Sequence, residues 1–179
     1  MDDSAEHASV PTVRPDTRPE VVDSEDGPAT PFPICLSGEI VKGFGRGSKE
    51  LGIPTANLAE EAIPKLLEHA ESGIYYGLAS IDGNDNVYDM VMSVGWNPYY
   101  KNTVRSAEVH VIHKFHDDFY NKNLKVIVVG FIRPEYNYTD LDSLVADINE
   151  DIRVAQRSLA RPAYRKYRED DFFHKSIKH

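Results

Sequence analysis

The stretch GIYYGLASIDGNDNVYDMVMSVG, residues 73–95, holds two runs that are rich in β-branched and aromatic residues. Such runs are typical of β-strands. Between them stands the tetrapeptide DGND, residues 82–85, whose composition favours a tight turn. The stretch therefore predicts an antiparallel hairpin of two strands, over residues 73–81 and 87–95.

Further strand-like runs flank this hairpin: ICLSGEIV (34–41), AEVHVIHKF (107–115) and LKVIVVGFI (124–132). In the second run Glu108 and His110 alternate with Val109 and Val111, whereas the third is almost continuously apolar, as in a strand covered on both faces. No helix-length amphipathic segment separates the runs, which argues against βαβ units. We expect a mainly β fold, a six-stranded antiparallel Greek-key β-barrel.

One long C-terminal helix should pack on this barrel. Apolar residues recur at helical spacing at Leu141, Leu144, Val145, Ile148, Ile152, Ala155 and Leu159. Thr139 with Asp142 resembles a capping box, and Pro162 should end the helix. A second, short helix is predicted over residues 64–69.

Residues 1–33 have a different composition. They contain six of the eleven prolines, eight acidic and two basic residues, and few large apolar side chains. Such a segment buries too little surface to offset the entropy of ordering. We expect a disordered, dispensable acidic tail, followed by one domain over residues 34–179.

The formal net charge of −9 lies mostly in that tail. The domain has no basic excess of the kind a non-specific nucleic-acid binder needs, so no nucleic-acid partner is expected. No apolar run is long enough to span a membrane, and no secretory signal is visible. Cys35, the only cysteine, is interpreted as a small buried residue. A cytoplasmic protein is expected.

The stretch VKGFGRGSKELGIPTANL, residues 41–58, matches neither a Walker-type phosphate loop nor a dinucleotide fingerprint. Composition alone indicates a turn-rich surface loop. A functional alternative is that its alternate glycines let backbone N–H groups approach an anion. Thr55 and Asn57, after Pro54, offer neutral oxygen ligands to a hard cation, which nucleotide phosphates would complete.

Several motifs together resemble the riboflavin kinase (flavokinase) family: GFGRGSKELGIPTAN, GIYYG, SVGWNPYYKN, EVHVIH, DFY and VGFIRPE. The resemblance extends from Ile34 to Phe173. It implies a six-stranded barrel and transfer of the ATP γ-phosphoryl group to the 5′-hydroxyl of riboflavin. It also implies Mg²⁺ as cofactor, with Zn²⁺ or Mn²⁺ as alternatives, and ATP and riboflavin (or FMN) as partners. A monomer is expected.

The resemblance also implies residue roles. Thr55 and Asn57 would hold the metal and the ATP phosphates, Glu108 would be the catalytic base, and Arg133 would lie at the flavin side. The nucleotide phosphates would be covered by Gly43, Gly45 and Gly47, with Lys49 close by. Without the resemblance, Glu108 would be interpreted as a solvated strand carboxylate.

Other residues that could bind a metal or nucleic-acid bases are better interpreted as structural. His110 and His113 should face opposite sides of a strand, which is poor geometry for a shared metal. Residues 95–102 are expected to form an ordered loop rather than a base-stacking platform. The adjacent Asp117 and Asp118 are expected in a mobile loop.

Two other functions compete with the kinase. A non-catalytic flavin-binding barrel would not need the glycine loop together with Thr55 and Asn57. A bifunctional enzyme that also adenylylates FMN would need a second nucleotidyltransferase domain with an HxGH-type signature, which the sequence lacks.

Overall fold

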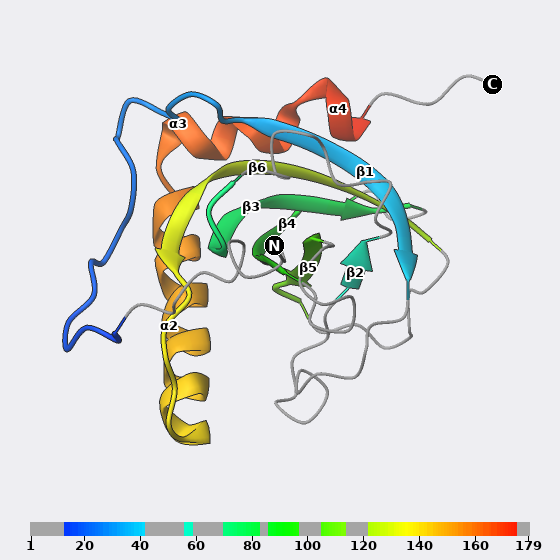
Figure 1. Cartoon of the computed structure of the whole chain (residues 1–179). Helices are drawn as coiled ribbons and strands as arrows, with labels where there is room; N and C mark the ends of the chain where they lie inside the picture. Colours follow the sequence, from blue (N-terminus) through cyan, green and yellow to red (C-terminus); the bar gives the residue numbers. More distant parts are fainter. Residues whose placement is uncertain are drawn as a thin grey trace, which may run out of the picture.

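The computed structural model describes residues 13–41, 56–58, 70–82, 86–96, 105–113 and 122–174 (Figure 1). Its strands are β1 (Ile34–Val41), β2 (Ala56–Leu58), β3 (Gly73–Ile81), β4 (Tyr88–Trp96), β5 (Arg105–Val111) and β6 (Asn123–Pro134). Its helices are α2 (Leu141–Leu159), α3 (Pro162–Arg165), the 3-10 helix η4 (Lys166–Glu169) and α4 (Asp171–His174). The expected mainly β chain with a long C-terminal helix is confirmed.

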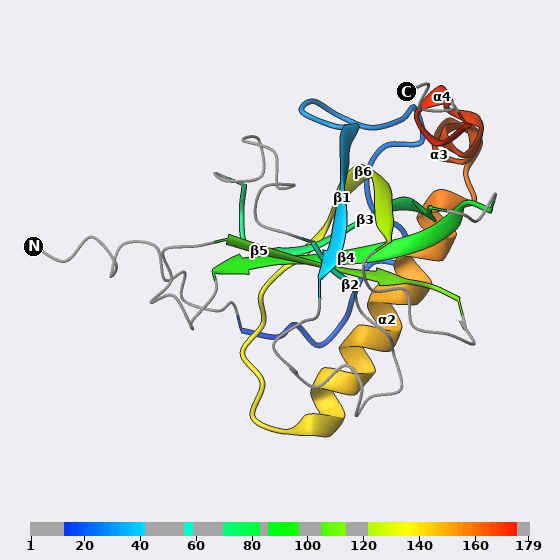
Figure 2. The same ribbon diagram turned by 90° about the vertical axis from the view of Figure 1, so that its right-hand side faces the viewer.

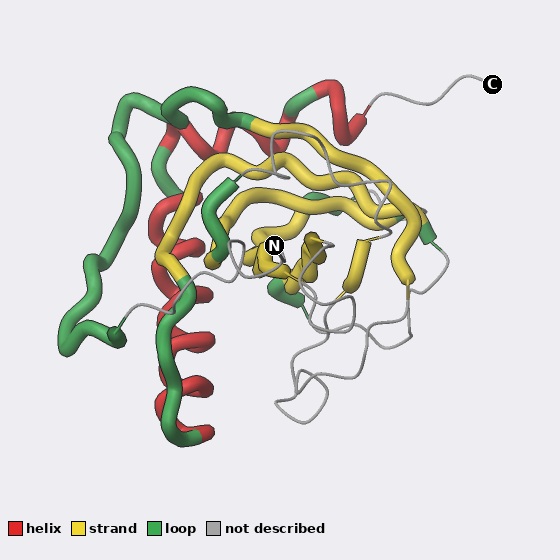
Figure 3. Tube along the Cα trace, in the orientation of Figure 1, coloured by secondary structure: helices red, strands yellow, loops and turns green. Residues whose placement is uncertain are grey.

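The strands close into one antiparallel barrel in the order β1-β2-β5-β4-β3-β6 (Figure 3). The predicted hairpin is confirmed, because β3 and β4 pair from Gly73 opposite Val94 to Ala79 opposite Tyr88. Strand β2 was not predicted as a strand. It has three residues, too few for alternation to be visible, and it lies inside the glycine-rich stretch.

The barrel interior is the first hydrophobic core. Its fully buried side chains include Ile40, Met90, Met92, Val94, Val109, Leu124 and Val126. Gly77 of β3 faces this interior, and a Cβ there would overlap the carbonyl oxygen of Ile127 on β6. The absence of a side chain at Gly77 thus lets β3 and β6 approach closely.

A second core lies outside the barrel, where α2 packs on β3, β4 and β6 (Figure 2). Leu78, Ile127 and Val129 of the sheet contact a cluster that includes Ala155 and Leu159 of α2. β6 therefore contributes alternate side chains to both cores, which confirms the prediction that this strand is covered on both faces.

The start of α2 differs from the prediction by one residue. Asp140, not Thr139, is the N-cap, and its carboxylate accepts a hydrogen bond from the backbone N–H of Ser143 at 2.8 Å. Aspartate is among the preferred N-cap residues and its charge suits the positive end of the helix dipole. Pro162 begins α3 at its first turn, directly after α2 has ended.

Residues 13–33, here named the N-terminal arm, do not form the expected disordered tail. The arm runs along α2 and α3 (Figure 1). The Val22 N–H donates to Ser158 Oγ at 3.1 Å, and the Tyr76 hydroxyl donates to Asp23 Oδ2 at 2.8 Å. The expectation was wrong here because composition does not reveal partners far along the chain.

Asp23 fits against the barrel because β6 has a glycine beneath it. A Cβ at Gly130 would overlap the Asp23 carboxylate and would approach the Tyr76 ring closely. Next to it, the Tyr164 hydroxyl donates to the carbonyl oxygen of Ser24 at 2.7 Å. Gly130 therefore provides the space in which the arm contacts the sheet.

Several smaller predictions can be compared with the structure. Cys35 is exposed, not buried, because it lies on the outward face of β1. The predicted helix over residues 64–69, most of the loop at 95–102, and the Asp117–Asp118 pair lie outside the described residues. In the part of the chain that the structure describes, no helix is both long and apolar enough to cross a membrane.

Candidate active site

The barrel brings most of the described candidate residues into one line across its strands. Each member is the direct cross-strand partner of the next. In order, the line is Val41, Asn57, Glu108, Ser93, Ile74 and Arg133, one residue from each strand. We refer to this line as the cross-strand row.

The side chains of the row point away from the barrel interior. Directly opposed residues of neighbouring strands share a face of the sheet. Ala107 and Val109, on either side of Glu108, face the interior core, so Glu108 faces outward. Asn57 and Ser93 therefore lie on the outer surface on either side of Glu108. Their Cα atoms are one strand spacing from it, about 5 Å.

The glycine-rich stretch leaves and rejoins the barrel at this row. β1 ends at Val41, β2 begins at Ala56, and Val41 pairs with Asn57. The predicted phosphate-binding residues Gly43, Gly45, Gly47 and Lys49, and the predicted metal ligand Thr55, lie outside the described residues. One end of their segment is nevertheless fixed at Val41, which pairs with Asn57, and the other at Ala56, on the strand that pairs with that of Glu108.

The donor atoms of the row suit a hard cation. Asn57 offers an amide oxygen and Glu108 a carboxylate, and oxygen ligands are what Mg²⁺ selects. Among the described residues no cluster of three or more His, Cys, Asp or Glu side chains could hold a metal. That nucleotide phosphates would complete the coordination of a cation at Asn57 stays a prediction from the sequence.

The two histidines near Glu108 have separate surroundings. His110 lies two residues from Glu108 on the outer face and is buried, which lowers its pKa to about 4. His113 follows the end of β5, and its ring lies 4.6 Å from that of Tyr88. The strand ends before His113, so the predicted alternation between the two residues does not extend that far.

Arg133 lies at the far end of the row from Asn57. It is three strand spacings from Glu108, about 14 Å along the sheet. Its guanidinium makes a two-pronged ion pair with Asp151 of α2, with Nε–Oδ1 at 2.8 Å and Nη2–Oδ2 at 2.9 Å. Nη1 donates to the Pro134 carbonyl oxygen, and the group lies over the Tyr136 ring at 4.6 Å. All three guanidinium nitrogens thus have protein partners.

Sequence reasoning missed three residues around this site. Ser93 is exposed and lies opposite Glu108, but a lone serine in an apolar run gives no signal. Asp147 and Asp151 are buried on α2. Their spacing of four residues, beside the apolar stripe of the helix, matches the spacing of Arg14 and Arg18 in the tail, and that match could have suggested the pairing.

Comparison with known proteins identifies a family. A family model described as "Flavokinase: Riboflavin kinase" matches residues 30–159. A riboflavin kinase from Homo sapiens is 49% identical over 142 residues, which cover 79% of this chain and 91% of that protein. One from Pyricularia oryzae is 48% identical over 162 residues, covering 82% and 81%.

A solved structure shares the fold. The riboflavin kinase from Trypanosoma brucei superposes with a TM-score of 0.67 at 23% identity, covering 84% of this chain and 95% of that one. At this identity the likeness shows the barrel architecture alone. The family-model match and the identities to curated relatives go further, and they show that this chain belongs to the riboflavin kinase (flavokinase) family.

Proposed function

We propose that this protein is a riboflavin kinase, which transfers the γ-phosphoryl group of ATP to the 5′-hydroxyl of riboflavin. The products are FMN and ADP. The observation that carries the proposal is the cross-strand row, which puts Asn57, Glu108 and both ends of the glycine-rich segment side by side in a chain of this family.

The residue types suit this reaction. Phosphoryl transfer depends mainly on positioning and on stabilisation of charge. The riboflavin hydroxyl oxygen bonds to the γ-phosphorus, and the bond from that phosphorus to the bridging oxygen of ADP breaks. The hydroxyl proton passes to the carboxylate of Glu108 as general base. Gly43, Gly45, Gly47 and Lys49 would contact the nucleotide phosphates, as the family resemblance implies.

A divalent cation would be held by Thr55 and Asn57 and would neutralise developing phosphate charge. Mg²⁺ is the preferred ion, with Zn²⁺ or Mn²⁺ as alternatives. The amide oxygen of Asn57, a type of ligand that Mg²⁺ accepts, supports this choice. At the other end of the row, Arg133 would help to shape the flavin half of the site. We place the protein in the cytoplasm, since its single cysteine suits a reducing compartment. We also propose that it acts as a monomer.

The direct test is to incubate the purified protein with riboflavin, ATP and Mg²⁺ and to separate the flavins. FMN formed together with an equal amount of ADP supports the kinase. No product would favour the flavin-binding barrel. FAD would favour the bifunctional enzyme.

Replacement of Thr55 by alanine should weaken MgATP binding by about tenfold and leave riboflavin binding nearly unchanged. The variant loses one oxygen ligand from a site with few protein ligands, and tenfold corresponds to about 1.4 kcal/mol. Separate titrations of MgATP and riboflavin measure the two affinities. An equal fall in both would contradict the metal assignment and indicate a general folding defect.

A further inference from the structure

We propose that Arg18, on the N-terminal arm, is a positioning residue for the flavin half of the site. It would act through Asp151 on Arg133, the member of the cross-strand row at the end of β6. The inference rests on the proposed riboflavin kinase function and on the place of Arg133 in the flavin half.

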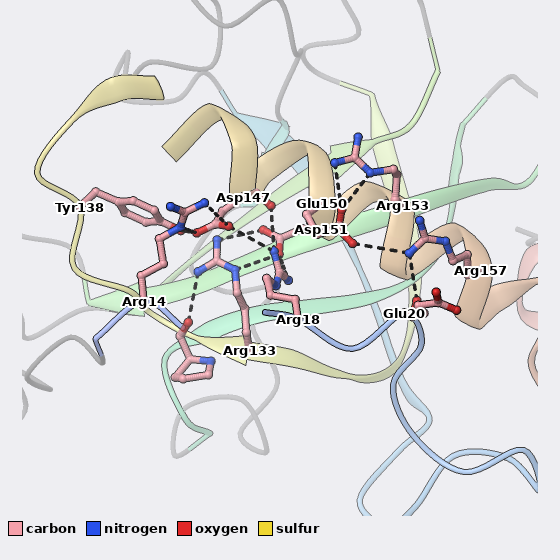
Figure 4. A network of polar contacts seen from close by, with 11 residues as sticks. Arg14, Arg18, Glu20, Arg133, Tyr138, Asp147, Glu150, Asp151, Arg153 and Arg157 are labelled. Carbon is pink, nitrogen blue, oxygen red and sulfur yellow. Dashed lines mark hydrogen bonds and ion pairs between the residues drawn. The ribbon is translucent and has the colours of Figure 1, made fainter. Parts of the chain in front are cut away.

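The first observation is a pair of buried carboxylates on α2. Asp147 and Asp151 are 2% and 3% exposed, and they lie one helical turn apart on the side of α2 that faces the arm and the end of β6 (Figure 4). A buried carboxylate without a cationic partner strongly destabilises a fold. Cations must therefore be supplied to this face of the helix by other parts of the chain.

Asp151 receives two arginines from different parts of the chain. Arg18 Nη2 donates to its Oδ1 at 2.5 Å from the arm, and Arg133 donates to both oxygens from β6. The side chains of all three residues are less than 10% exposed. One carboxylate thus joins the arm, the helix and the flavin end of the row, so a shift of any of the three groups must move the others.

Asp147 adds a second contact to the same arm. Arg14 donates to both of its oxygens, at 2.7 and 3.2 Å, and the Tyr138 hydroxyl donates to it at 2.7 Å. Arg18 also donates to the Asp147 carbonyl oxygen at 3.2 Å. Although burial raises the pKa of Asp147, the hydrogen bonds from Arg14 and Tyr138 and the charges of Arg14 and Arg133 outweigh burial and hold that pKa below its ordinary value.

The arm supplies two of the three arginines that balance the charges of Asp147 and Asp151. With the arm in place, Arg14, Arg18 and Arg133 face the two carboxylates. Without it, Arg133 alone among these cations would face both. Arg133 would then lie between two carboxylates that compete for it, and its present two-pronged geometry on Asp151 would no longer be imposed.

The arm is also held firmly enough to position a side chain. Beyond Arg18, the Val22 N–H donates to Ser158, and Arg161 donates to the carbonyl oxygens of Val22 and Asp23. The Tyr76 hydroxyl donates to Asp23. Contacts on both sides of Arg18 in the sequence thus restrict where its guanidinium can lie, as a positioning residue requires.

The test separates positioning from a purely structural tie. Arg18→Met removes the cation but keeps a long side chain, and Arg18→Lys keeps the charge but loses the planar fork. Arg153→Met is the matched control, because Arg153 pairs with the half-buried Glu150 on the exposed side of α2, away from Arg133. KM for riboflavin and for MgATP are measured for each variant, with direct riboflavin titration and thermal melting.

In Arg18→Met we expect KM and Kd for riboflavin to rise about tenfold, which corresponds to about 1.4 kcal/mol. KM for MgATP should stay within about twofold of the wild-type value, well below that tenfold effect. Arg18→Lys should show an intermediate rise, and Arg153→Met should show neither.

The inference is overturned if riboflavin and MgATP constants stay unchanged in Arg18→Met, whatever its melting temperature, or if both constants rise together. Should Arg18→Met fail to fold, the same comparison in Arg18→Lys decides. A wild-type protein that forms no FMN would instead refute the proposed function. In that case riboflavin titration of the variants still tests the role of Arg18.

Discussion

Replacement of Glu108 by glutamine should lower the single-turnover rate of phosphoryl transfer by about 10²–10⁴-fold, the usual contribution of a general base. Glutamine keeps the size and the outward position next to Asn57 but cannot accept the riboflavin hydroxyl proton. Binding of MgATP and riboflavin should stay near wild type. Quenched-flow measurement of FMN under single-turnover conditions avoids masking by slow product release.

Glu39→Gln provides the matched control. Glu39 is an exposed, outward-facing glutamate on β1, opposite Asn123 and outside the cross-strand row. Its replacement should leave the rate unchanged, and both variants should melt like wild type. If Glu108→Gln stays within about threefold of wild type, well short of a general-base effect, Glu108 is not the base. Positioning by the metal ligands and the glycine loop would then carry the reaction.

Deletion of residues 1–33 should lower the melting temperature by roughly 6–20 °C. The deletion removes Arg14 and Arg18 and leaves Asp147 and Asp151 with too few cations. Loss of one partner of a buried ion pair costs about 3–5 kcal/mol, and in a chain of this size each 1 kcal/mol shifts Tm by about 2–4 °C. This expectation replaces the one from sequence, that the tail is dispensable.

Two further variants make the test specific. Deletion of residues 1–12 keeps every described contact of the arm, and it should leave Tm unchanged. Asp147→Asn should destabilise the full-length protein, because Arg14 loses its carboxylate, but it should stabilise the truncated protein by removing an unpaired buried charge. A truncated chain that melts within about 2 °C of full length, an effect of at most about 0.5–1 kcal/mol, would show that the arm contributes far less than a buried ion pair.

Much of the fold could be predicted because its signals are local. Strands β3, β4 and β6 are long and rich in β-branched or aromatic residues, and α2 carries a sustained apolar stripe. β2 could not be predicted, since three residues carry no usable period. The N-cap was misplaced by one residue, because Thr139 and Asp140 both belong to the residue types that cap helices.

The sequence by itself determined the strand-rich class, the terminal helix and the motifs that identify the family. The tertiary structure alone decided that Asn57 and Glu108 are direct neighbours, because barrel closure pairs β2 with β5 although other strands lie between them in the chain. It also decided that the N-terminal arm is ordered against α2 and the barrel. Ordering this acidic, proline-rich segment costs entropy. Ion pairs with carboxylates that α2 buries far along the chain, hydrogen bonds to α2 and α3, and the space above Gly130 offset that cost.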